Sequence, residues 1–154
     1  MEGCAVNRCK VTKPMSGQDA AYLAGLIDGE GTIALTRRHA HEERQLVLSI
    51  SSTEPELLEW TRSATGVGKI TRKRTVSERH APGLTYSVSN RQALAVIAAV
   101  APYLRSYKRH RAALVLDRYL LVTRRNGKYD AATLEAKRKF EDTFIAITAG
   151  GAQQ

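Results

Sequence analysis

Cysteine is scarce in this chain: its 154 residues include only Cys4 and Cys9, both near the N-terminus. Neither is accompanied by a further Cys or His pair at the spacing of a zinc site. We therefore expect two free thiols in a reducing, intracellular compartment. The sequence favours neither an organelle (chloroplast or mitochondrion) nor a prokaryotic cytoplasm.

Long apolar runs are also missing. The longest extends from Ala93 to Ala101 and stops at Pro102, well short of the ~20 residues that cross a bilayer. The first residues are polar and mildly basic, without the apolar core of a signal peptide. We therefore expect no membrane partner.

Acidic residues are outnumbered, because 24 Lys and Arg stand against 15 Asp and Glu, for a net charge of +9. This balance indicates a polyanionic partner, although it does not separate DNA from RNA or from an acidic membrane. The length and the 43% hydrophobic content fit one domain with a buried core. We expect that domain to span residues 16–148, with residues 1–15 as a disordered tail and residues 149–154 as a frayed end.

Capping signals and hydrophobic alternation predict an α+β fold. Ser16 and Asp19 form a capping box for a helix from about 18 to 28, and Thr53 with Glu56 forms another, with Pro55 in its first turn. Alternating segments predict two hairpins, and further helices follow, the first of them capped by Ser89 and Gln92. The predicted hairpins pair 32–38 with 45–51 and 69–76 with 84–88, and the helices cover about 93–101, 107–123 and 130–147. Helices that cover one face of a four-stranded antiparallel sheet leave its other face open for binding.

The most informative segment is residues 23–31, which read Leu-Ala-Gly-Leu-Ile-Asp-Gly-Glu-Gly. This apolar helical stretch runs into an acidic residue between two glycines, so we expect a carboxylate on a tight turn at a helix end. The last carbonyls of a helix have no intrahelical partner and carry the negative end of its dipole, which favours a cation. The Glu30 carboxylate and the Gly29 carbonyl offer hard oxygen ligands, which suit Mg²⁺ better than zinc.

This segment resembles the signature of the LAGLIDADG homing endonucleases, with which it shares seven of nine positions. The resemblance implies an αββαββα domain with a curved sheet that lies in the DNA major groove, and a Mg²⁺-dependent double-strand DNA endonuclease in which Mn²⁺ can substitute. Only one motif copy is present, which in this family implies a homodimer and a long pseudo-palindromic target. Glu30 and Gly29 of each subunit would hold the metal near the dimer axis. The dimer contact would use the small residues of the motif helix and Asp28, that is Ala21, Ala24, Gly25 and Asp28.

Two further catalytic candidates follow from the resemblance. Relatives carry a lysine a short way after a proline, at the start of the next helix, that polarises the active-site water. Lys108 aligns best with it and Arg105 is the rival; a merely phosphate-clamping or solvated basic cluster is the alternative reading. Many relatives also end the second strand with a polar residue that positions water. Ser52 is the equivalent here, although its hydroxyl reaches less far than Gln, and Thr53 is better explained as a helix cap.

Strand alternation assigns the side chains that face away from the helices. Arg, Lys, Gln and Thr are suited to reading base edges in a major groove, but they are also ordinary residues of exposed strands. Arg72 and Arg74 leave the phase of the third strand ambiguous. The predicted DNA-binding residues are Thr32, Ala34, Thr36, Arg38, Gln45, Val47, Ser49, Lys69, Thr71, Lys73, Thr75, Thr85 and Ser87.

Other motifs indicate ordinary structural roles. His39 and His41 lie at the tip of the first hairpin and are expected to be solvated or to contact DNA rather than to bind metal. The larger aromatic residues occur at helical spacings and are expected in the core: Trp60, Tyr103, Tyr119, Phe140 and Phe144. Two alternatives to the endonuclease stay open, an RNA maturase that binds a group I intron and a catalytically silent DNA-binding regulator. The acid at position 30 argues against the regulator, because a pure binder gains nothing from a carboxylate facing phosphates.

Overall fold

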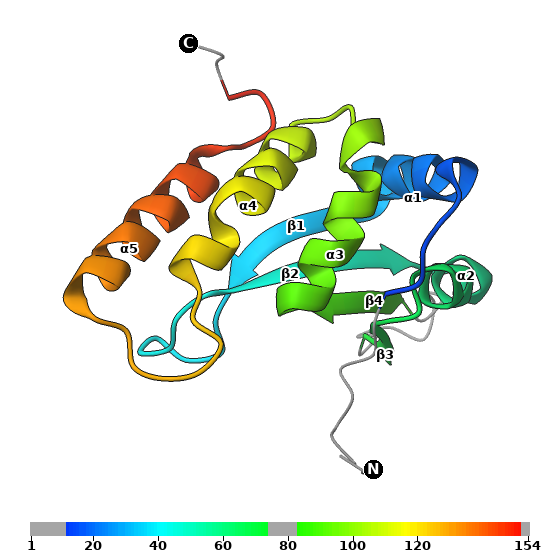
Figure 1. The fold of residues 1–154 in the computed structure, drawn as a ribbon. Helices are drawn as coiled ribbons and strands as arrows, with labels where there is room; N and C mark the ends of the chain where they lie inside the picture. The colour runs from blue at the N-terminus through cyan, green and yellow to red at the C-terminus, as the bar shows by residue number, and fades with distance from the viewer. Residues whose placement is uncertain (1–11, 74–82, 152–154) are drawn as a thin grey trace, which may run out of the picture.

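A computed structural model describes residues 12–73 and 83–151, and it confirms the α+β class and the predicted αββαββα order (Figure 1). A short 3-10 helix and two longer helices extend the pattern at its C-terminal side. The elements are α1 (Gly17–Glu30), β1 (Gly31–Thr36), β2 (Gln45–Ser52), α2 (Pro55–Thr65), β3 (Lys69–Arg72), β4 (Leu84–Ser89), α3 (Asn90–Val100), η1 (Ala101–Tyr103), α4 (Lys108–Val122) and α5 (Ala131–Ala146). No helix among the described residues is long and apolar enough to span a bilayer.

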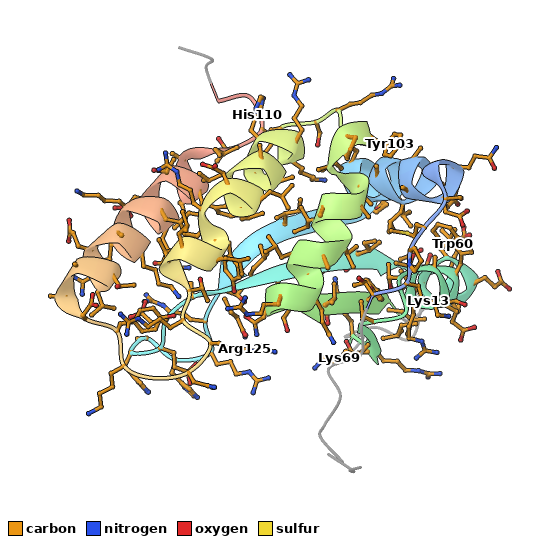
Figure 2. The ribbon with its side chains drawn as sticks, viewed as in Figure 1. Lys13, Trp60, Lys69, Tyr103, His110 and Arg125 are labelled. Carbon is orange, nitrogen blue, oxygen red and sulfur yellow. The ribbon has the colours of Figure 1, made fainter. Side chains whose placement is uncertain are left out.

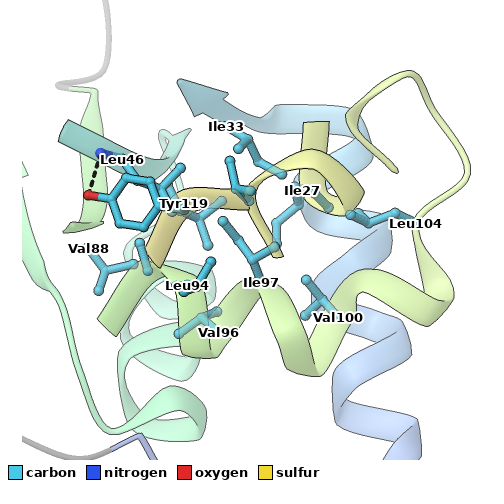
Figure 3. Packing of buried hydrophobic residues seen from close by; sticks show 14 of the residues in the cluster. Ile27, Ile33, Leu46, Val88, Leu94, Val96, Ile97, Val100, Leu104 and Tyr119 are labelled. Atoms are coloured by element: carbon cyan, nitrogen blue, oxygen red, sulfur yellow. Dashed lines mark hydrogen bonds between the residues drawn. The ribbon is translucent and has the colours of Figure 1, made fainter. Parts of the chain in front are cut away.

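The four strands form one antiparallel sheet in the order β1-β2-β4-β3, and the helices lie on one side of it (Figure 1). Alternate strand residues point toward the helices, and most of them, such as Ile33, Leu48 and Tyr86, are buried there. Ile97 and Val100 of α3 and Tyr119 of α4 complete this core (Figure 3). The Tyr119 hydroxyl also accepts a hydrogen bond from the backbone N–H of Leu46 at 3.3 Å, which ties α4 to β2. The other side of the sheet, here called the open face, carries no helix.

The junction between α1 and β1 differs from the predicted tight turn. The helix continues through Glu30 and the strand begins at Gly31 without an intervening loop. Neither glycine beside Glu30 has a positive φ, so the turn prediction was wrong. Gly31 is needed for close packing instead, because a Cβ there would lie 2.7 Å from the Cα of Ile27. The result is a rigid transition that holds Glu30 where the helix meets the sheet.

Two of the predicted helix caps need correction. Ser16 does cap α1, because its Oγ accepts a bond from Asp19 N at 3.1 Å. The N-cap of α2, however, is Glu54 rather than Thr53, because Pro55 occupies the first helical position and fixes where the helix begins. Ser89 is the N-cap residue of α3, but it makes no side-chain capping bond among the described residues.

The N-terminal boundary of the domain lies earlier than predicted. Lys13 donates its backbone N–H to Thr65 O at 2.8 Å, and Met15 packs against the core. Residues 12–15 are therefore part of the folded domain, because Lys13 is hydrogen-bonded to the end of α2 and Met15 contacts the core. The remaining residues of the expected tail, with Cys4 and Cys9, lie outside the described residues, as does Thr75.

Candidate active site and nucleic-acid interface

Glu30 is the last residue of α1 and its side chain is exposed. Within the described residues its carboxylate has no hydrogen-bond or ion-pair partner, and Gly29 beside it is also exposed. The structure thus presents an exposed carboxylate without a direct partner at the point where the motif helix enters the sheet. This is the chemistry that a cation ligand requires.

Lys108 lies at the same helix end. It begins α4 and its side chain is buried, with only 8% of the residue exposed. Its Nζ donates to the carbonyls of Ile27 and Asp28, both at 2.8 Å, and so satisfies two carbonyls of the last turn of α1. Burial lowers the pKa of Lys108, while the nearby carboxylates of Asp28 and Glu30 act in the opposite direction.

Between the two basic candidates, it is the Lys108 side chain that reaches the end of α1. Arg105 is exposed and contributes only its backbone N–H there, to Asp28 Oδ2 at 2.9 Å. The predicted choice of Lys108 is therefore favoured by the geometry. Its catalytic role stays a prediction.

Asp28 fastens α1 to the segment that precedes α4. Its Oδ1 accepts bonds from the backbone N–H of Ser106 at 3.1 Å and from the Ser106 hydroxyl at 2.5 Å. Burial by itself would raise the pKa of Asp28, but the hydrogen bonds from Ser106 and Arg105 together hold it below its ordinary value. Asp28 and Lys108 thus lock the two helix ends together in both directions. The carboxylate predicted to contact a second subunit is engaged inside its own chain.

The outer face of α1 is lined by small residues at a spacing of four. Ala21, Gly25 and Gly29 are exposed, and a Cβ added at Gly25 or Gly29 would meet nothing within 4 Å. Ala24, in contrast, is fully buried in the core of its own chain. Its predicted contact with a partner was therefore wrong, because the helix turns that position toward the sheet.

Ser52 has a local structural contact. Its Oγ accepts a hydrogen bond from Glu54 N at 3.0 Å, just before α2. Its ladder partner is Leu84, which places it on the helix side of the sheet rather than on the open face. The polar residue that faces outward at this end of β2 is Ser51, whose Oγ lies 3.0 Å from Thr85 Oγ1. The sequence alternation could have identified Ser51, because it continues the phase of Ser49.

The open face carries the strand residues that alternation predicted. One row crosses all four strands, because Thr32 pairs with Ser49, Ser49 with Ser87 and Ser87 with Lys69. Arg38 and Lys73 lie just beyond the strands and are exposed. The described strand residues on this face are Thr32, Ala34, Thr36, Gln45, Val47, Ser49, Ser51, Lys69, Thr71, Thr85, Ser87 and Ser89. Ser51 and Ser89 are additions to the predicted set.

This face has a hollow at the end of the sheet that is farther from Glu30. A depression of about 410 Å³ is lined by residues that include Arg38, Gln45, Val47, Lys69 and Ser87. His39 and His41, at the tip of the same hairpin, are exposed and stack in parallel with ring centroids 5.7 Å apart. The face therefore combines hydroxyl, amide and basic groups with little apolar bulk.

The predicted core aromatics divide into two groups. Tyr119, Phe140 and Phe144 are buried, as expected. Trp60 is half-buried and meets the ring of Tyr22 edge-on, with centroids 4.9 Å apart. Tyr103 is 41% exposed, so its assignment to the core was wrong; it lies in η1 and lines a hollow beside the outer face of α1.

The sequence matches no protein-family model and no curated protein. Its fold, however, matches solved structures. The homing endonuclease I-CvuI, in complex with a DNA target and 2 mM Mg, has a TM-score of 0.66 and 21% identity over 89% of this chain and 86% of that one. The group I intron-encoded homing endonuclease I-CeuI, complexed with DNA, has a TM-score of 0.60 and 17% identity over 86% and 68% of the two chains. The LAGLIDADG homing endonuclease I-GzeII, with its DNA target, has a TM-score of 0.60 and 15% identity over 91% of this chain and 47% of that one.

These neighbours agree with the observations made on the chain itself. The motif of residues 23–31 forms a helix that enters the sheet at Gly31, and the sheet leaves one polar face uncovered. The chain spans most of I-CvuI and about half of I-GzeII. It has the fold of the LAGLIDADG homing endonucleases.

Proposed function

We propose that this protein is a sequence-specific endonuclease that cleaves both strands of duplex DNA. The observation that carries the proposal is the exposed, unpaired carboxylate of Glu30 at the point where α1 enters β1. A carboxylate gains nothing from facing phosphates unless a cation lies between them, because like charges repel. The neighbours described as DNA complexes of homing endonucleases support the same activity.

The donor set fits divalent metal ions only if another molecule completes it. The described residues hold no cluster of three or more His, Cys, Asp or Glu that could bind a metal. One chain offers the Glu30 carboxylate and the Gly29 carbonyl, which are hard oxygen ligands suited to Mg²⁺ or Mn²⁺. A second subunit and the scissile phosphates would supply the remaining oxygens. When bound, such ions activate water and neutralise the charge that develops on the phosphate.

The residues of the chain itself position this chemistry. Lys108 fixes the last turn of α1 through Ile27 and Asp28, so that Glu30 keeps its place relative to the sheet. Its ammonium, close enough to be influenced by the Glu30 charge, would polarise the attacking water. The open face would hold the duplex in register, reading base edges through groups such as Gln45 and Lys69.

Cleavage provides the direct test. Purified protein incubated with a random DNA library is expected to cut a small set of long pseudo-palindromic sequences when Mg²⁺ or Mn²⁺ is present, and to cut nothing in EDTA. Sequencing of the cleaved ends gives the activity and the target together. If no duplex is cut with either metal, or if cleavage persists in EDTA, the proposal is wrong.

The proposal requires two subunits joined through α1, and Gly25 allows this to be tested. Gly25→Leu should leave the protomer folded, because the position is open to solvent and Leu stabilises a helix by up to about 1 kcal/mol relative to Gly. Its side chain would keep a second α1 from approaching. We therefore expect a folded monomer in sedimentation and circular dichroism, without the stabilisation that a dimer contact adds, and a loss of double-strand cleavage.

Ala98→Leu is the matched control, because it enlarges another exposed small residue on α3, far along the chain from the motif. It should leave both the mass in solution and the cleavage rate unchanged. A Gly25→Leu variant that still dimerises and cleaves would exclude α1 as the subunit contact.

A further inference from the structure

A second hollow adjoins the open face on the side of α3 and α4. It has a volume of about 570 Å³, and its lining includes Arg91 at the start of α3 and Arg124 and Arg125 just after α4. Ser89 and Gln92 line this hollow and also the one on the open face. The two hollows are therefore neighbours, and the surface of the sheet continues around its end toward the helices.

Both hollows are basic. The first is lined by Arg38 and Lys69 and the second by three arginines, and no Asp or Glu of the described residues lines either one. Figure 2 shows Lys69 and Arg125 along the same lower edge of the molecule. A surface with several basic residues and no acidic ones attracts a polyanion.

The arginines of the second hollow have different roles. Arg124 donates to Lys128 O at 3.0 Å and to Asp130 Oδ2 at 2.7 Å, so it shapes the loop between α4 and α5. Asp130 in turn caps α5 by accepting from Thr133 N at 2.7 Å. Arg91 and Arg125 are exposed, and within the described part of the chain neither has an ion-pair partner. Two guanidinium groups are thus left to meet a ligand.

Their position relative to Glu30 indicates which part of a ligand they meet. Gly31, next to Glu30, pairs with Ile50, whereas Ser89 at the second hollow pairs with Val47, closer to the tip of the β1–β2 hairpin. The arginines therefore lie at the end of the open face that is farther from the carboxylate. If a duplex is centred near Glu30 and lies along the open face, the part of it that extends beyond that face passes Arg91 and Arg125.

We propose that Arg91 and Arg125 form a phosphate-binding flank, which holds the backbone of duplex DNA just outside the segment read by the open face. This inference rests on the proposed function for the placement of the duplex. One guanidinium group can donate to two phosphate oxygens at once. Such contacts fix the register of the protein on the duplex without reading its sequence. Both arginines would therefore strengthen binding to any duplex that is long enough to reach them.

The test compares two double variants that remove the same charge. Arg91→Gln with Arg125→Gln removes the flank, and Arg118→Gln with Arg138→Gln removes two exposed arginines of α4 and α5 that line neither hollow. Fluorescence anisotropy with a long random-sequence duplex in EDTA gives affinity as a function of salt. Each phosphate contact contributes about 0.9 to the logarithmic salt slope, so the flank variant should lose about 1.8 per subunit. The control variant should keep the wild-type slope.

A short duplex that covers only the open face should not distinguish the flank variant from wild-type protein. The inference is overturned if both double variants lose the same slope, or if the flank variant loses affinity for structured RNA and none for DNA. Wild-type protein that binds duplex with a steep slope but cleaves none with Mg²⁺ would contradict the nuclease proposal alone. The salt titration would still show whether Arg91 and Arg125 contact phosphates.

Discussion

Replacement of Glu30 by Gln is expected to reduce double-strand cleavage at least about a thousandfold, since the metal contribution to such a reaction is several kcal/mol and each 1.36 kcal/mol is tenfold in rate. The amide keeps the size of the side chain but removes the charge that would hold the metal. Folding should not change, because the Glu30 carboxylate has no partner among the described residues. DNA binding should be kept or slightly strengthened, because one negative charge facing the phosphates is lost.

The measurements are single-turnover cleavage of the selected target in Mg²⁺ and anisotropy binding in EDTA. Glu59→Gln on α2 is the matched control, because it also neutralises an exposed glutamate of a helix and should cleave at the wild-type rate. Cleavage by Glu30→Gln within tenfold of wild type would remove Glu30 from the chemistry. A parallel loss of DNA binding would show a role in docking instead.

The sheet was the part of this fold most readily predicted. Leu46, Leu48 and Ile50 recur at every second position of β2, and the structure buries these three and turns their neighbours to the open face. The period of two assigns faces within a strand whatever lies above it. The sequence also indicated that Glu30 lies near the end of a helix, although it ended that helix near residue 28, whereas α1 continues through Glu30.

The assignments on α1 show where such reasoning stops. Ala21, Ala24 and Gly25 are all small, and their composition does not say which of them faces a partner. The buried side of the helix is set by α3 and the sheet, which turn Ala24 inward and leave Ala21 and Gly25 exposed. The predicted tight turn failed for a related reason, since the need for Gly31 comes from its approach to Ile27 and not from its own φ.

Contacts between residues distant in sequence were also beyond prediction. Counting along the chain indicated Lys108, but its bond to Ile27 O spans 81 residues and is visible only in the folded chain. The same holds for the proposed flank, because Arg91 on α3 and Arg125 after α4 line one hollow only once the chain is folded. Patterns of local spacing carry no information on such pairs until the helices are placed on the sheet.

Replacement of Lys108 by Met should affect both stability and cleavage. Ile27 O keeps its bond from Gly31 N–H, so the part-buried Asp28 O is the carbonyl that loses its donor. The expected cost is about 1 kcal/mol, at the low end of the range for a buried acceptor. If the ammonium also polarises the attacking water, cleavage at a temperature where the variant is folded should fall by about a hundredfold or more. Urea unfolding and single-turnover cleavage measure the two effects separately.

Lys137→Met separates these roles, because Lys137 of α5 is also a buried lysine, only 2% exposed, and lies away from the end of α1. Its Nζ donates to Tyr129 Oη at 3.3 Å. It should lower stability to a similar extent and leave cleavage by the folded protein unchanged. If Lys108→Met cleaves as fast as Lys137→Met under conditions where both are folded, then Lys108 serves only as a cap for α1. A selective loss of cleavage at Lys108 would instead mean that the group fixing the motif helix also acts on the reaction, so that the placement of Glu30 and the activation of water depend on one buried ammonium.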